Sequence, residues 1–290
     1  MAKSLIDVDW SISRSNNLDL SLRRFRRYQE ELGHTESTIE GYIGNVKRYL
    51  TFSGTDRPTL QDWDRFRSTL FDRKLARATI NQYSFSARAY HAMLGEDLRV
   101  KRLEPHNEIP YYFDEDDIIK ILGAVNNLMH LAMLELCFFA CLRSSELIVL
   151  DVGDVDLRSL TVRVKGKGGR IASVHLHPEC VQTLRQYFEV RPPVEVDGKR
   201  PLFFTKYGNR WQRTEFSRMF ARYKRLANVT KPGGLHVFGR HSPASIMVKN
   251  GCDILTVKEL LRHRDIKTTT RYLHISDQTM RLKHNRFLRL

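Results

Sequence analysis

Apolar residues recur at helical spacing along most of this chain, and one segment departs from that rule. From residue 18 to about residue 98 they fall three and four positions apart, as on one face of a helix. Residues 159–176, SLTVRVKGKGGRIASVHL, instead hold two β-branched stretches around Gly166, Gly168 and Gly169. That pattern is typical of a hairpin or a three-stranded sheet with a glycine-rich turn. The sequence therefore predicts a mainly α fold with a small β-sheet.

A short segment bracketed by prolines divides the helical pattern into two blocks. Pro105 and Pro110 enclose HNEI, so residues 104–112 are expected to form an extended linker. Residues 18–103 predict a compact all-α domain, preceded by a polar, flexible lead at residues 1–17. Residues 113–290 contain a buried helix expected at 131–142, the sheet and further helices. They predict a larger α+β domain with a C-terminal tail.

The charge of the chain points to a polyanionic partner. The sequence has 48 Lys and Arg against 33 Asp and Glu, a net charge of +15, of which +11 lies after Glu104. Such a surplus favours nucleic acid. No apolar run approaches the roughly 18 residues that a membrane span needs, and no basic amphipathic stretch suits a membrane surface. No GxxxxGK[ST] or GxGxxG motif is present, so no bound nucleotide is expected.

The cysteines and the N-terminus bear on the compartment. The four cysteines form no CxxC pair, which argues against a zinc site or a disulfide framework and fits a reducing cytosol. The first ten residues lack the apolar core of a secretion signal. A cytoplasmic protein associated with the nucleoid is therefore expected.

Polar residues at five places suggest a catalytic site. Each place alone is unremarkable, because an arginine at a helix end or a lysine in a turn is usually solvated or paired. His236 and Arg240, in LHVFGRH, would share one face if that segment is helical. The candidate catalytic residues are Arg143, Lys167, His236, Arg240, His263 and Tyr272.

These side-chain types together suit nucleophilic attack on a phosphodiester. The transition state carries extra negative charge on its non-bridging oxygens, which planar guanidinium groups bind in bidentate fashion. A tyrosine, with a usual pKa near 10, needs a cationic pocket to become a nucleophile. A lysine on a hairpin could protonate the leaving 5′-oxygen. No metal or other cofactor is needed, and no carboxylate cluster that would bind a metal stands out.

The local sequence around these residues resembles that of the tyrosine recombinase (phage integrase) family, including Xer-type recombinases. The resemblance runs from Leu18 nearly to the end of the chain. It rests on DLSLRRFRRYQEELGHTESTIEGYIGNVKRYL, ACLRSSEL, VRVKGKG, RHSPAS and NGCDILTVKELLRHRDIKTTTRYLH.

The resemblance implies a SAM-like core-binding domain at 18–103 and an α+β recombinase catalytic domain at 113–290. It also implies a role for each candidate residue. Arg143 and Arg240 would bind the phosphate, Lys167 would be the general acid, His236 the first histidine, His263 the residue at the His/Trp position, Tyr272 the nucleophile, and Glu146 a supporting acid.

Two positions depart from the family pattern. The family usually has HxxR, whereas this chain has HVFGR, one residue longer. Either Gly239 absorbs the insertion and His236 keeps its role, or His241 is used instead. Arg262 stands where the family usually has glycine, and it could add a DNA contact beside His263.

The function implied is site-specific recombination of double-stranded DNA at a specific site. Strands would be cleaved and rejoined through a 3′-phosphotyrosyl intermediate and a Holliday junction, for integration, excision or dimer resolution. A homotetramer on DNA that exchanges C-terminal tails is expected, with the two domains holding the duplex from opposite faces. The alternatives are a catalytically decayed integrase homologue that only binds DNA and a type IB topoisomerase-like enzyme that relaxes DNA.

Overall fold

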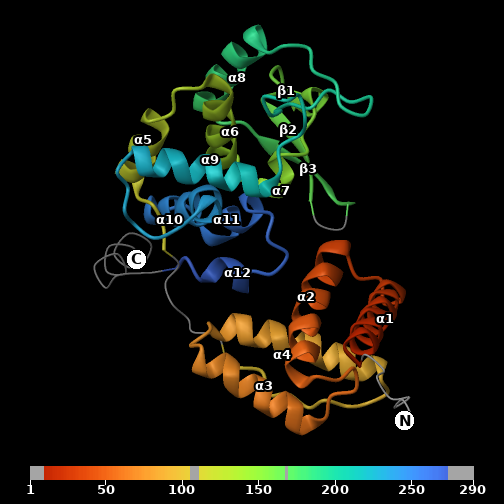
Figure 1. Ribbon diagram of the computed structural model, residues 1–290. Helices are drawn as coiled ribbons and strands as arrows, with labels where there is room; N and C mark the ends of the chain where they lie inside the picture. The colour runs from red at the N-terminus through yellow and green to blue at the C-terminus, as the bar shows by residue number, and fades with distance from the viewer. Residues whose placement is uncertain (1–9, 105–110, 167–168, 274–290) are drawn as a thin grey trace, which may run out of the picture. The chain divides into compact units, whose positions relative to one another are not determined.

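The computed structural model describes residues 10–104, 111–166 and 169–273 (Figure 1). The chain divides into two compact units, Met1–Asn107 and Glu108–Leu290. Most of the expected linker, residues 105–110, and the C-terminal tail from residue 274 lie outside the described residues. Among the described residues, no helix is both long enough and apolar enough to cross a membrane.

The first unit is all-α and is built around an aromatic core. Tyr49 packs against Trp63 and Phe66, and Phe25 meets Tyr90 edge to face. The third helix begins with a capping box formed by the residues at its N-cap and N3 positions, which satisfies free backbone N–H groups. The helices are α1 (Trp10–Glu31), α2 (Glu36–Ser53), α3 (Leu60–Asp72) and α4 (Arg77–Met93).

The expected flexible lead at residues 1–17 is wrong for residues 10–17. These residues form the first turns of α1, which begins at Trp10 rather than near Leu18. Neither glycine nor proline interrupts the sequence from Trp10 to Glu31. Because adding a residue to an existing helix is far easier than starting one, the helix extends into this polar segment. Residues 1–9 lie outside the described part of the chain.

The second unit packs helices around one buried helix, α6 (Figure 1). Its buried residues include Met133, Leu136 and Cys137, and it contacts α8, α10 and the turn η3. It ends at Phe139 rather than at the predicted Leu142, because Cys141 adopts a φ of +49°, which no right-handed helix accommodates. The helices and helical turns are α5 (Glu115–Gly123), α6 (Leu128–Phe139), α7 (Ser144–Leu147), η1 (Val152–Asp154), α8 (Pro178–Val190), α9 (Arg213–Leu226), η3 (Val237–His241), α10 (Ser242–Lys249), α11 (Ile254–Leu260) and α12 (Lys267–Thr270).

The glycine-rich segment forms part of a three-stranded antiparallel sheet with the order β1-β2-β3. The strands are β1 (Val155–Asp156), β2 (Thr161–Lys165) and β3 (Ile171–His175). Val162 and Val164 are buried, while Arg163 and Lys165, which alternate with them along the strand, are exposed, as expected when one face of a sheet covers a core. The prediction of a mainly α fold with a small sheet is confirmed.

Candidate active site

The turn that follows α6 positions Arg143 and Glu146. The left-handed conformation of Cys141 turns the chain into α7, and Arg143 is the N-cap residue of that helix. Glu146 accepts hydrogen bonds from the backbone N–H of Arg143 at 2.8 Å and from its Nη1 at 2.7 Å. The Arg143 side chain is 37 % exposed, whereas that of Glu146 is only 4 % exposed. The buried carboxylate therefore holds a guanidinium group that still faces solvent.

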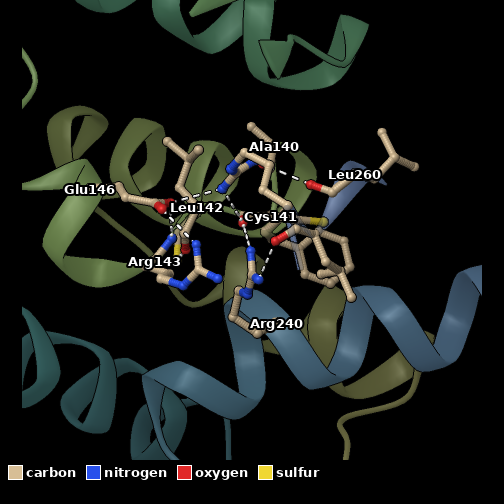
Figure 2. Close-up of polar contacts among 11 residues, drawn as sticks. Ala140, Cys141, Leu142, Arg143, Glu146, Arg240 and Leu260 are labelled. Carbon is tan, nitrogen blue, oxygen red and sulfur yellow. Dashed lines mark hydrogen bonds and ion pairs between the residues drawn. The ribbon is translucent and has the colours of Figure 1, made fainter. Parts of the chain in front are cut away.

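Arg240, which lies 99 residues after Cys141 in the sequence, contacts the same turn. Its side chain is fully buried, and its Nη1 donates to the carbonyl oxygen of Cys141 at 2.6 Å, while Nη2 donates to that of Leu261. Burial, together with the charges of Arg143 and Arg262, lowers the pKa of Arg240 to about 10. The group still carries its charge at neutral pH. Figure 2 shows Arg143, Glu146 and Arg240 gathered around the turn from Ala140 to Leu142.

A π-helical turn absorbs the additional residue in HVFGR. Residues Val237–His241 form this turn, in which the backbone bonds run from residue i to i+5 rather than i+4. Gly239 lies against α6, and a Cβ at that position would overlap Cys137 Sγ and lie 3.2 Å from the Cys137 carbonyl oxygen. Only glycine allows the turn to approach α6 so closely. His236 precedes the turn and is exposed.

The two histidines that could fill the first-histidine position lie close together. The rings of His236 and His241 are 4.9 Å apart at their centroids and nearly perpendicular. His241 Nδ1 shares a hydrogen bond of 2.7 Å with the Tyr272 hydroxyl. Burial, with His236 and Arg271 nearby, lowers the pKa of His241 to about 4, so its ring is neutral at pH 7. The structure thus brings His241 to the tyrosine and leaves His236 facing outward.

Tyr272 is buried among apolar residues next to this arginine-rich turn. It is 4 % exposed and packs in one cluster with Cys141, Val257 and Leu261. Cys141 and Leu261 are the residues whose carbonyl oxygens bind Arg240. Burial raises the pKa of the Tyr272 hydroxyl, against the lowering effect of the Arg271 and Arg240 charges. Burial therefore favours the protonated form of the hydroxyl.

His263 follows α11 and is fixed by a buried threonine. Its Nδ1 shares a hydrogen bond of 2.9 Å with Thr269 Oγ1, and Thr269 is fully buried. Burial, then the charges of Arg240 and Arg143, lowers the pKa of His263 to about 4. The imidazole is therefore neutral at pH 7.

Lys167 lies outside the described residues. The strand that leads to it does approach the site, because a Cβ on Gly166 would lie 4.0 Å from Glu146 Oε1. Among the described residues, no group of three or more His, Cys, Asp or Glu side chains is placed to hold a metal ion.

The sequence does not reveal where the side chain of Arg262 points. The sequence allows a contact with DNA beside His263; in the structure the side chain is 16 % exposed and pairs with Glu146 at 2.8 Å. Its φ of +53° lies in the left-handed region, where glycine is the usual residue. That φ explains why a family pattern with glycine fits the position, and the pairing shows where the arginine side chain goes.

A basic groove opens beside the site. Its lining extends from Ser144 and His236 along α9, and the lining cations include Arg213, Arg218 and Arg225. Because His236 is part of the lining, an elongated anion in the groove would extend to the edge of the arginine-rich turn.

Comparison with known proteins identifies relatives across the chain. Residues 111–279 match the model of the phage integrase family. A tyrosine recombinase XerD from Staphylococcus saprophyticus is 28 % identical over 295 residues, which cover 93 % of this chain and 99 % of that protein. A tyrosine recombinase from Thermosipho africanus is 28 % identical over 267 residues, 84 % of this chain and 91 % of that protein.

Solved structures share the fold at lower identity. The Tn1549 transposon integrase, solved with circular intermediate DNA, superposes with a TM-score of 0.74 at 16 % identity and covers 92 % of this chain and 99 % of its own. The XerH recombinase bound to difH gives a TM-score of 0.70 at 17 % identity, with 95 % of this chain and 96 % of that chain covered. The family match spans more than half of the residues and contains every candidate catalytic residue. The chain belongs to the phage integrase family.

Proposed function

We propose that this protein is a site-specific DNA recombinase that cleaves and rejoins strands through a covalent link to Tyr272. One observation carries the proposal. The chain belongs to the phage integrase family, and its Tyr272 hydroxyl shares a hydrogen bond with His241. Arg240, the residue before His241, is hydrogen-bonded to the turn that also positions Arg143. Metal-free attack on a phosphodiester requires this combination of a nucleophile and fixed cations.

Arg143 and Arg240 are the proposed phosphate-binding groups. Two guanidinium groups match the two non-bridging oxygens of a phosphodiester, whose negative charge grows in the transition state. Bonds to Glu146 and to the Cys141 carbonyl hold them before DNA arrives. Preorganised donors need little rearrangement during the reaction. His236 and His263 are proposed as further donors to the same phosphate.

Tyr272 is the proposed nucleophile. Its oxygen would attack phosphorus and form a 3′-phosphotyrosyl bond, while the bond to the 5′-oxygen breaks and Lys167 protonates that oxygen. Attack by a 5′-hydroxyl from the partner duplex would reverse the step and exchange the strands through a Holliday junction. The phosphotyrosyl link is itself a phosphodiester and conserves the free energy of the broken bond, so rejoining needs no energy from a cofactor. Because Tyr272 is buried here, DNA binding must uncover its hydroxyl.

Double-stranded DNA is the proposed substrate, with a homotetramer as the active assembly. The basic lining of the groove along α9 supports this proposal, as do relatives solved with DNA. We propose that each protomer binds one half of a specific recombination site at the nucleoid. The tail from residue 274, outside the described residues, would dock on a neighbouring protomer.

The test is covalent capture on DNA. The unmodified protein should form a covalent protein–DNA adduct when it is incubated with host DNA. Mapping the captured DNA ends identifies the recombination site, and a nicked suicide duplex that carries this site is then used as the substrate. Tyr272→Phe should bind that duplex and form no adduct, while Tyr207→Phe, at an exposed tyrosine, should form it normally.

Three outcomes would contradict the proposal. Adduct formation by Tyr272→Phe would exclude this nucleophile. Relaxation of any plasmid without synapsis would indicate a topoisomerase, and DNA binding without cleavage by the unmodified protein would indicate a DNA-binding protein that has lost catalysis.

A further inference from the structure

Arg262 occupies an unfavourable position in the fold. Its φ of +53° is strained for a residue with a Cβ. Its Nε is buried and finds no hydrogen-bond partner in the described part of the chain. Its charge also acts on the buried Arg240, whose pKa it helps to lower. Features of this kind reduce stability, and they are found where a site requires a residue for another reason.

The Arg262 guanidinium group donates hydrogen bonds to two oxygen atoms of the candidate active site. Nη2 donates to Glu146 Oε2 at 2.8 Å and to the Cys141 carbonyl oxygen at 3.0 Å. Nη1 donates to the Leu260 carbonyl oxygen at 3.2 Å, which ties the guanidinium to its own turn. The side chain thus joins the turn before His263 to the turn that follows α6.

The contact with Glu146 determines how strongly that carboxylate holds Arg143. Oε1 binds Arg143 Nη1, whereas Oε2 is shared between the Arg143 backbone N–H and Arg262. A buried carboxylate needs compensating charge. Without Arg262, Arg143 would be the remaining cation bonded to Glu146 among the described residues. The Arg143 guanidinium would then turn further toward the carboxylate and away from the phosphate.

The contact of Arg262 with the Cys141 carbonyl oxygen affects the position of Arg240, which binds the same oxygen. The Cys141 carbonyl oxygen accepts from Arg240 Nη1 at 2.6 Å and from Arg262 Nη2 at 3.0 Å. Cys141 itself has a left-handed backbone, with a φ of +49°. A second donor holds this strained peptide group in the orientation that Arg240 requires.

We infer that Arg262 is a positioning residue that sets both phosphate-binding arginines, Arg143 through Glu146 and Arg240 through the Cys141 carbonyl. The inference rests on the proposed recombinase function. With a side chain that is 16 % exposed and bonded on two sides, Arg262 acts on the protein and not on DNA.

The experiment compares Arg262→Gly with Arg264→Ala. Glycine removes the side chain and accepts the positive φ without strain. Arg264, two residues on, is exposed, so its replacement removes the same charge from the same loop. At saturating protein, Arg262→Gly should form the covalent adduct at least about tenfold more slowly, with DNA affinity within about twofold of the unmodified protein. Arg264→Ala should cleave at the normal saturating rate.

A double variant tests the route through Glu146. Glu146→Gln keeps an acceptor for the Arg143 backbone and removes the charge that draws its guanidinium. Adding Glu146→Gln to Arg262→Gly should therefore slow cleavage no further than Arg262→Gly alone, since coupled residues are not additive. A normal saturating rate for Arg262→Gly, a loss of its DNA affinity well beyond twofold, or additive losses in the double variant would overturn the inference.

A readout independent of activity separates this inference from the proposed function. The guanidinium protons of Arg240 are buried and bonded, so they should exchange slowly with solvent in the unmodified protein and at least about tenfold faster in Arg262→Gly, as measured by NMR. If the unmodified protein forms no adduct with DNA, the proposed function fails. The exchange rates still decide the positioning role, and unchanged exchange would refute it.

Discussion

The hydroxyl of Tyr272 and Nδ1 of His241 lie 2.7 Å apart, so the candidate nucleophile is bonded to the residue that directly follows Arg240. This contact depends on the π-helical turn, because the turn fixes where His241 points relative to Arg240. The low pKa of His241, about 4, results mainly from burial and keeps Nδ1 or Nε2 free of a proton. A neutral imidazole could accept the phenol proton in the attack proposed for Tyr272.

His241→Phe is expected to slow adduct formation while leaving DNA affinity unchanged. Phenylalanine fills the space but cannot accept a proton, and proton transfer by a positioned side chain contributes about 10²-fold or more. His241→Asn is the control, because its amide oxygen can keep the hydrogen bond without taking the proton. Single-turnover rates on a suicide duplex measure both. An unaltered rate in His241→Phe would show that the contact only holds the tyrosine at rest.

Gly239→Ala should destabilise the second unit by about 1–3 kcal/mol, the usual cost of overpacking a core. The added methyl group would overlap Cys137 Sγ and force the π-helical turn away from α6. Gly41→Ala is the matched control, because Gly41 lies in α2 with nothing within 4 Å of the position of a Cβ. Urea unfolding of the two variants gives the comparison, and equal stabilities would mean that the turn tolerates the methyl group.

The sequence predicts much of this molecule where the signal is local. The two β-branched stretches around Gly166, Gly168 and Gly169 predict a hairpin or a three-stranded sheet, and the structure has a three-stranded antiparallel sheet. Local signals fail where a distant contact decides the outcome. The direction of Arg262 depends on Glu146, 116 residues away in sequence. An additional residue in HVFGR can be absorbed by a loop, a bulge or a π turn, and packing of Gly239 on α6 selects the last of these.

Stability should fall as the pH drops below about 6.5. His241 and His263 have a pKa of about 4 in the folded protein, against about 6.5 in an unfolded chain. The unfolded state therefore binds more protons between these values, so the contribution of these two histidines to the free energy of unfolding decreases as the pH falls through that window and is constant above it. Thermal unfolding from pH 7 to pH 5, above the range where most carboxylates titrate, measures the slope. The double variant His241→Gln, His263→Gln should show a smaller slope, and an equal slope would assign the effect to other groups.

Arg218→Ala should weaken DNA binding and reduce its dependence on salt. Arg218 is exposed and lines the groove beside His236. Each phosphate contact releases bound counterions, so losing one should lower the slope of log affinity against log salt by about 1. Arg185→Ala removes the same charge from an exposed position on α8, outside the groove lining, and should alter the slope less. Equal slopes for both variants would mean that the groove does not follow the DNA backbone.

Lys167→Ala tests which group protonates the leaving oxygen. Residues 167–168 lie outside the described residues, but the preceding Gly166 lies beside Glu146 and thus near Arg143. If Lys167 is the general acid, its loss should slow cleavage by about 10²-fold or more. A substrate with sulfur in place of the 5′-bridging oxygen should restore the rate, because a thiolate leaves without a proton. Lys165→Ala, at an exposed position two residues earlier, should cleave both substrates normally. If sulfur fails to rescue Lys167→Ala, the lysine binds the phosphate and another group supplies the proton.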